Sequence, residues 1–98
     1  MVAMWRDFVN TESYAREKAS VDIMARKLKT VFEAIGFTCS LYDGTPNGDS
    51  LVGTWGDMNK GKPIFFSGHF DTVFPKGSFG ANPFHIDANG LAHGPGCL

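Results

Sequence analysis

The stretch that decides the fold is Phe65–Phe79, FFSGHFDTVFPKGSF, in which an apolar run leads into one histidine, one aspartate and then a Pro/Gly loop. Apolar side chains on consecutive positions predict a strand over residues 64–67 that is covered on both faces. In open α/β sheets, functional groups collect beyond the carboxyl ends of central strands. We therefore expect His69 and Asp71 to lie in a crevice at the end of this strand.

His69 and Asp71 are two residues apart, so their side chains project to the same side of an extended chain. The carboxylate then lies close enough to the imidazole for a hydrogen bond. Three interpretations fit this pair: a metal ligand oriented by its carboxylate, a general base with its orienting acid, or a hydrogen bond that closes a loop. The spacing alone does not choose among them.

Two helices are expected before this stretch. The apolar side chains of residues 5–9 indicate a short helix that stops near NTES, where Asn10, Thr11 and Ser13 offer oxygens to cap the element that follows. A longer amphipathic helix comes next, because apolar residues recur at three-and-four spacing. They are Val21, Met24, Ala25, Leu28, Val31, Phe32 and Ile35. We expect this stripe to pack in the core and Gly36 to end the helix.

Four further strands are expected around the central one. The first alternates apolar and polar residues, the pattern of a half-buried strand, and the last two form a closing hairpin. They comprise residues 37–42, 51–55, 84–87 and 91–93. A turn is expected at residues 58–63. The order of elements predicts one α/β domain over residues 1–98, with a mixed sheet and helices packed on its faces.

Composition and charge exclude several classes of partner. Of the 98 residues, 43% are hydrophobic and 19% are charged, which provides apolar material for one core. A formal net charge of -1 leaves no basic face for nucleic acid. No apolar run approaches the roughly 20 residues of a spanning helix, and Arg6 and Asp7 stand where a signal peptide is apolar. We therefore expect no membrane partner and a cytoplasmic chain.

Two other patterns, a calcium-loop-like stretch and the two cysteines, do not indicate a binding site. The stretch DGTPNGDSLVGT, residues 43–54, has several residues of a calcium loop, but Thr54 stands where the bidentate glutamate belongs. Cys39 and Cys97 lie far apart, without the spacing of a metal site or the density of a disulfide scaffold. We expect both cysteines to be free thiols.

The closing hairpin contains the other two histidines. His85 and His93 lie on opposite sides of its turn, where they can approach each other. We expect them to be surface side chains without a carboxylate or thiolate ligand nearby. Asp87 is expected to be a turn acid.

The segments SGHFDTVFPKGSF, NPF and DANGLAHGPGCL, all within residues 67–98, together resemble the zinc exopeptidase and deacylase family. This family includes glutamate carboxypeptidases, acetylornithine deacetylase, succinyl-diaminopimelate desuccinylase and aminoacylases. Its members show GHxDTV after a central strand, a P-x-G loop, Pro-Phe, and a hairpin before a G-x-G run. FVNTES, the amphipathic helix and the first two strands are similar to the family's opening. Gly94-Pro95-Gly96 is more like the glutamate carboxypeptidase branch.

The resemblance implies a role for each residue of the pair. His69 matches the histidine that binds one of two zinc ions, with cobalt as the alternative metal, and Asp71 matches the acid that supports this ligand in the catalytic centre. The implied fold is a three-layer αβα catalytic domain with a mixed β-sheet, of which this chain is a truncated part. The metal-bridging aspartate is expected directly after Leu98, so the 98-residue chain alone is expected to be inactive.

The implied reaction is hydrolysis of the amide bond of a peptide or N-acyl amino acid that carries a free carboxylate. The full-length enzyme is expected to be a homodimer, because members of the family pair through a domain that this chain lacks. Residues 75–79 are expected to turn the chain and to form part of the wall beside the metals. An alternative from another class is a stand-alone binding module, a non-catalytic relic that pairs with a partner through its sheet edge.

Overall fold

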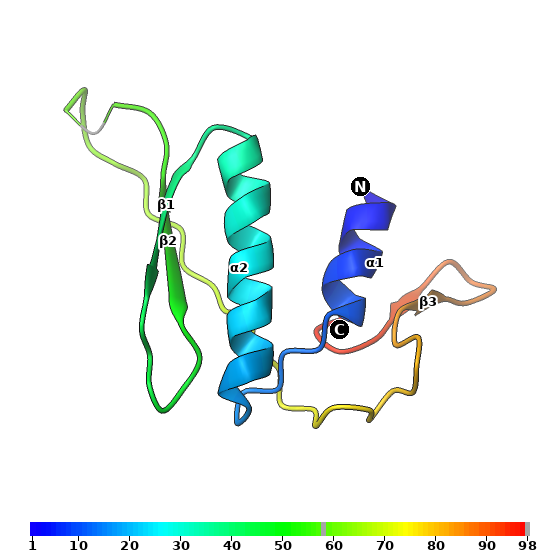
Figure 1. The fold of residues 1–98 in the computed structure, drawn as a ribbon. Coiled ribbons are helices and arrows are strands. Elements are labelled where there is room, and N and C mark those ends of the chain that lie inside the picture. Colours follow the sequence, from blue (N-terminus) through cyan, green and yellow to red (C-terminus); the bar gives the residue numbers. More distant parts are fainter. Residues whose placement is uncertain (58, 98) are drawn as a thin grey trace.

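Two helices open the chain, and both lie where the apolar spacing predicts them. The structure, a computed structural model, describes residues 1–57 and 59–97. Helix α1 comprises Val2–Asn10 and helix α2 comprises Lys18–Ala34 (Figure 1). Beyond α2, Gly36 adopts a φ of 101°, a left-handed conformation that glycine enters without steric cost. The predicted end of the long helix is therefore confirmed.

Four strands follow the helices. β1, Thr38–Tyr42, and β2, Ser50–Thr54, lie beside α2, whereas β3, His85–Ile86, and β4, Ala92–His93, form a small hairpin near α1 (Figure 1). These strands agree to within one residue at each end with the strands expected from alternation and turn residues. Met58, the first residue of the expected turn after β2, lies outside the described residues.

The strands form two separate antiparallel sheets instead of the one mixed sheet that we expected. In the first sheet Thr38 lies opposite Thr54, and the chain reverses over residues 43–49, which allows antiparallel pairing. Parallel pairing within the described residues is limited to a single bridge between Tyr14 and Thr72. Residues 1–57 and 59–97 thus form a small α/β unit of two helices and two hairpins.

The core draws on α1, the first half of α2 and the residue that precedes β3. Its buried apolar side chains are Val9, Val21, Met24, Ala25 and Phe84. Trp5 packs edge-on against Phe84 with ring centroids 5.3 Å apart, and the Arg6 guanidinium lies 4.7 Å from the centroid of the same ring. The start of the α2 stripe is buried as expected, but Ile35 at its far end is 63% exposed. Core packing is therefore confirmed for the first half of the stripe only.

The expectation of a covered strand at residues 64–67 is wrong. Ile64, Phe65 and Phe66 are 82%, 87% and 88% exposed, and the segment is outside every strand of the structure. β1 and β2 pair with each other, and no described strand lies hydrogen-bonded beside residues 64–67. A strand requires a partner for its backbone groups, so the apolar pattern alone did not form one.

The chain is also more open than a compact domain of its length. Its Cα radius of gyration is 15.2 Å, against roughly 13 Å for a compact domain of 100 residues. Large side chains such as Trp55, Val73 and Leu91 are more than half exposed. Across residues 1–57 and 59–97, no helix has both the length and the apolar content needed to cross a bilayer.

Candidate metal centre

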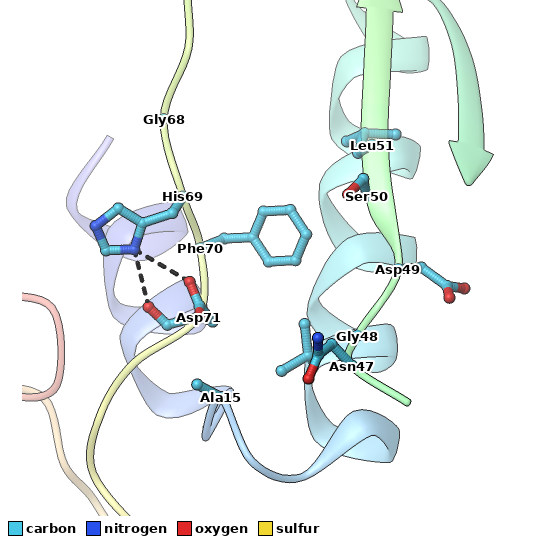
Figure 2. A pocket seen from close by; sticks show the side chains of 11 residues that line it. Ala15, Asn47, Gly48, Asp49, Ser50, Leu51, Gly68, His69, Phe70 and Asp71 are labelled. Atoms are coloured by element: carbon cyan, nitrogen blue, oxygen red, sulfur yellow. Dashed lines mark hydrogen bonds and ion pairs between the residues drawn. The ribbon is translucent and has the colours of Figure 1, made fainter. Parts of the chain in front are cut away.

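His69 and Asp71 are hydrogen-bonded to each other, as their spacing predicts. His69 Nδ1 lies 3.1 Å from the backbone oxygen of Asp71 and 3.2 Å from its carboxylate Oδ1 (Figure 2). Both of these oxygens are acceptors, so Nδ1 carries the proton and donates. The neutral ring then presents Nε2 with a free lone pair, which is the form of imidazole that binds a metal or accepts a proton.

The pair borders an open cleft, but this cleft does not lie at the end of a covered strand. The His69 side chain is 85% exposed and the Asp71 side chain 44%. Residues 68–71 form one wall of the cleft and residues 47–51, from the end of the turn before β2 and its first two positions, form another, around a volume of about 390 Å³. Phe70 projects toward β2, whereas His69 projects to the other side of its segment (Figure 2). The imidazole is therefore accessible to solvent.

A second cleft, of about 320 Å³, lies on the side of α1. It shares residues 69–71 with the first cleft and is otherwise lined mainly by apolar side chains of the two helices, among them Trp5, Phe8 and Leu28. Pro95 and Gly96 border it as well. The segment that carries the pair thus runs between two clefts, with few side chains packed around it.

The residues between the helices hold the chain that follows His69. Ser13 Oγ donates to the backbone oxygen of Phe70 over 2.6 Å. The Glu12 carboxylate accepts from the backbone N–H of Gly77, with N···O distances of 3.0 and 3.1 Å. These side chains act across 57 and 65 residues of sequence, so they connect the start of the chain to the loop beyond the pair.

Asn10 takes part in the same connection, because its Oδ1 accepts from the backbone N–H of Phe84 over 2.8 Å. The expectation that Asn10, Thr11 and Ser13 cap the following helix is therefore wrong. The N-cap residue of α2 is Glu17, and it makes no side-chain capping bond. A side-chain oxygen that could cap a helix can also accept a hydrogen bond from a distant backbone N–H. The sequence NTES does not distinguish a helix cap from such a long-range hydrogen bond.

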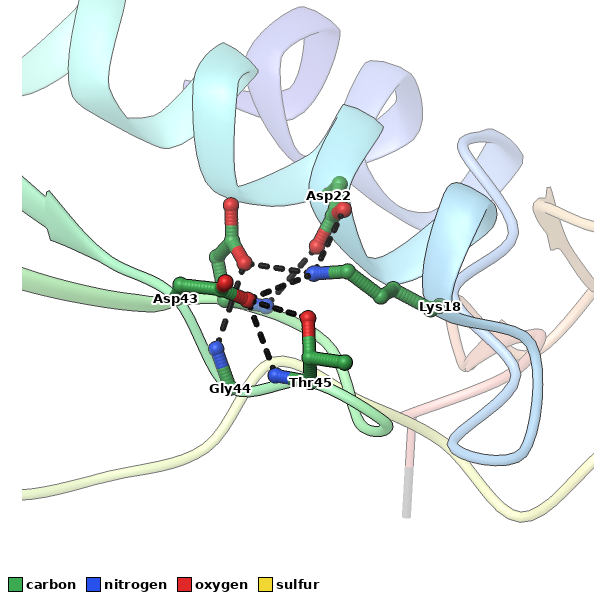
Figure 3. Close-up of polar contacts among 6 residues, drawn as sticks. Lys18, Asp22, Asp43, Gly44 and Thr45 are labelled. Carbon is green, nitrogen blue, oxygen red and sulfur yellow. Dashed lines mark hydrogen bonds and ion pairs between the residues drawn. The ribbon is translucent and has the colours of Figure 1, made fainter.

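A charged cluster joins the start of α2 to the turn between β1 and β2 (Figure 3). The Lys18 ammonium lies 2.6 Å from Asp49 Oδ1, 3.0 Å from Asp22 Oδ2 and 3.4 Å from Asp43 Oδ1. These contacts, the hydrogen bond to Asp49 first, raise the pKa of Lys18 above its usual value. Asp43 and Asp49 belong to the calcium-like stretch, but an ammonium group of the chain itself lies among their carboxylates. The cluster therefore favours a structural role.

We expect this cluster to make the fold sensitive to acid. The pKa of Asp22 lies below its ordinary value of 3.8, first because the backbone N–H of Asp49 donates to it. The Thr45 hydroxyl likewise lowers the pKa of Asp43. A carboxylate whose pKa is lowered by folding stabilises the folded state above its ordinary pKa, and this stabilisation is lost as the pH falls through the lowered value. Stability should therefore fall below about pH 4.

The Lys18→Met variant tests this expectation. Without the ammonium group the carboxylates repel one another, so the midpoint of acid unfolding should rise by about one pH unit. Circular dichroism along an acid titration measures it. The matched control is Lys60→Met, which removes an exposed lysine beyond β2 and should leave the midpoint in place. An equal shift in both variants would show that net charge, and not the cluster, determines the acid limit.

The rings of His85 and His93 stack across the second hairpin, with centroids 4.7 Å and planes 11° apart. The expectation that no carboxylate lies near them is wrong, because His93 Nε2 is 2.8 Å from Asp87 Oδ2. Asp87 Oδ1 accepts from the backbone N–H groups of Asn89 and Leu91, which confirms the turn acid. His93 first, and then these N–H groups, lower the pKa of Asp87. Nitrogens in stacked parallel rings do not converge on one ion.

Residues 1–57 and 59–97 contain no group of three or more histidine, cysteine, aspartate or glutamate side chains placed to hold a metal ion. His69 is therefore a single candidate ligand, accompanied by the carboxylate that orients it. Cys39 and Cys97 are free thiols, as expected. No family model, curated protein or solved structure matches this chain.

Proposed function

We propose that this chain is the amino-terminal part of the catalytic domain of a zinc-dependent amidohydrolase similar to the glutamate carboxypeptidases. In the complete enzyme, the helices and hairpins would belong to a three-layer αβα domain with one mixed sheet. The enzyme would act as a homodimer and hydrolyse the amide bond of a peptide or an N-acyl amino acid. His69 is the proposed metal ligand, and Asp71 is the residue that orients it.

The observation that carries this proposal is the direction of the His69 ring. Two oxygens of Asp71 accept from Nδ1, which leaves Nε2 as the free nitrogen on an exposed ring. A hydrogen-bonded loop closure would use the same Nδ1 contact, but it would not require the opposite nitrogen to be accessible. Orientation of a ligating histidine by a carboxylate is common in zinc sites. The exposed Nε2 therefore favours the metal-ligand interpretation.

The donor set fits one ligand of a zinc site and no more. A catalytic zinc takes three protein ligands and a water, and the described residues supply His69 alone at this place. The remaining ligands are proposed to come from chain beyond Leu98. When bound, two zinc ions would supply Lewis acidity toward the substrate carbonyl and toward a water. The residues of this chain would contribute orientation, because Asp71 fixes the tautomer and the direction of His69.

The 98-residue chain alone should bind zinc weakly and show no hydrolase activity. One imidazole without further ligands is expected to bind zinc far more weakly than a site with three protein ligands, and calorimetric titration with zinc chloride measures this affinity. Release of amine from an N-acyl amino acid should stay at the rate without protein. Tight zinc binding at one ion per chain, or turnover, would contradict the proposal that most ligands lie elsewhere.

The decisive experiment is to read the coding sequence past Leu98. An aspartate followed by Met-Lys-Gly-Gly would support the hydrolase, because the family resemblance requires the bridging ligand at this place. The protein expressed from the extended frame should then contain two zinc ions and release an amino acid from an N-acyl substrate. A stop codon directly after Leu98 in the intact gene would overturn the proposal.

The exposed apolar segment favours a second candidate function, a non-catalytic module that pairs with a partner. Ile64, Phe65 and Phe66 are almost fully exposed, and an unpaired extended segment of this kind is able to add a strand from another chain. This function predicts a stable complex that is lost in the Phe65→Ser, Phe66→Ser double variant, as measured by light scattering after gel filtration. A monomeric wild-type chain that takes up no partner strand contradicts it.

A further inference from the structure

Ser13 is a buried polar residue beneath an exposed pair. It is 2% exposed, whereas the side chains of His69 and Asp71 are 85% and 44% exposed. Its hydroxyl donates to the backbone oxygen of Phe70 over 2.6 Å. Its own backbone oxygen accepts from the N–H of Thr72 over 2.8 Å. One residue near the start of the chain therefore contacts both neighbours of Asp71.

These two hydrogen bonds hold the backbone on both sides of Asp71. The first holds the peptide group that precedes Asp71, and the second holds the peptide group that follows it. Once both peptide planes are fixed, the two backbone dihedrals of Asp71 have little freedom. The backbone oxygen and Oδ1 of Asp71 are the two acceptors of His69 Nδ1. Ser13 thus fixes the residue that supplies both acceptors.

The segment around the pair has little other support. Residues 61–69 and 73–82 are exposed and lie outside every strand of the structure. The N–H of Ala15 donates to the backbone oxygen of Thr72 over 2.8 Å, which completes the parallel bridge between Tyr14 and Thr72. The position of the pair relative to α1 and α2 therefore depends on the Ser13–Ala15 segment.

We propose that Ser13 is a positioning residue, which sets the tautomer and direction of the His69 ring by holding the backbone on both sides of Asp71. The link to metal binding rests on the proposed function, whereas the link to the tautomer does not. Glu12 and Asn10 hold the loop farther along, at Gly77 and Phe84. They anchor the loop, and Ser13 acts on the pair itself.

The test is the His69 tautomer in the metal-free 98-residue chain, measured by nitrogen-15 NMR of the imidazole ring at a pH where the ring is neutral. In the wild type the Nδ1–H tautomer should predominate. Ser13→Ala should lower the ratio of the Nδ1–H to the Nε2–H form by about three- to tenfold, because losing one hydrogen bond is worth this factor in an equilibrium. Ser13→Thr, which keeps the hydroxyl, should restore most of the ratio.

The matched control is Ser20→Ala, which removes the hydroxyl of another buried serine, in α2. It should leave the His69 tautomer ratio unchanged even if it lowers the melting temperature as much as Ser13→Ala. An equal ratio in the wild type and in folded Ser13→Ala would overturn the proposal. If Ser13→Ala does not fold, hydrogen exchange in the wild type decides. The Thr72 amide should exchange at least tenfold more slowly than the Val73 amide, and equal rates would overturn the proposal.

The outcome is separable from that of the proposed function. The tautomer ratio is measured without zinc and without a substrate, so it can respond to Ser13 even if the extended frame encodes no hydrolase. Conversely, the extended protein could be an active zinc enzyme while its His69 tautomer ratio is the same in the wild type and in Ser13→Ala. That result would refute the positioning role and leave the proposed function intact.

Discussion

The proposed hydrolase function predicts that replacing His69 with alanine, in the protein expressed from the extended reading frame, lowers kcat/KM for an N-acyl amino acid by more than about 100-fold. Loss of the outer partners of metal ligands already costs roughly 10–100-fold in affinity or activity, so loss of a ligand itself should exceed that range. One of the two zinc ions should be lost or greatly weakened at the same time. Steady-state kinetics and metal analysis of the purified variant measure both effects.

Two further variants distinguish a ligand from a histidine of general importance. His85→Ala removes an exposed histidine of the second hairpin, outside the proposed site, and should keep full zinc content and activity. Asp71→Ala removes one of the two acceptors of Nδ1 but not the backbone oxygen. The activity of Asp71→Ala should therefore lie between the activities of the wild type and His69→Ala, with a loss of about 10–100-fold relative to the wild type. Full activity and two zinc ions in His69→Ala would rule out its role as a ligand.

The helices and strands of this chain could be predicted because their signals are local. The apolar spacing before Gly36 and the alternation around Cys39 depend on residues a few positions apart, and the structure reproduces them. The hydrogen bond between His69 and Asp71 is equally local, since two residues of spacing in an extended chain determine which side each faces. Such features do not depend on the rest of the fold.

Apart from the contact between His93 and Asp87, six residues apart in the second hairpin, the failures concern contacts between distant parts of the chain. Consecutive apolar residues at 64–66 predict a strand that is covered on both faces. A strand forms only when a neighbouring strand pairs with its backbone, and the described residues provide no such neighbour. The oxygen of Ser13 reaches across 57 residues to Phe70, and no local pattern separates this use from helix capping. The signal that the sequence offered was a small polar residue in the short segment between the two helices.

A large effect on stability is expected at Gly94. Its φ is 144°, a backbone conformation that residues with a Cβ rarely adopt. An added Cβ would lie 2.5 Å from Val9 Cγ1 and 3.1 Å from the backbone oxygen of Pro83. Val9 belongs to the buried core between α1 and the second hairpin, and its branched side chain has little freedom to move away. Gly94→Ala therefore combines backbone strain with overpacking.

Gly61 provides the matched control, because its φ is 135° and an added Cβ would meet nothing within 4 Å. Strain alone should cost Gly61→Ala about 1 kcal/mol, whereas strain and overpacking together should cost Gly94→Ala roughly 2–4 kcal/mol. At about 4–8 °C per kcal/mol for a domain of this size, thermal unfolding should separate the two variants clearly. Equal melting temperatures would mean that Val9 moves aside without cost, and the close approach of the second hairpin to α1 would then not be rigid.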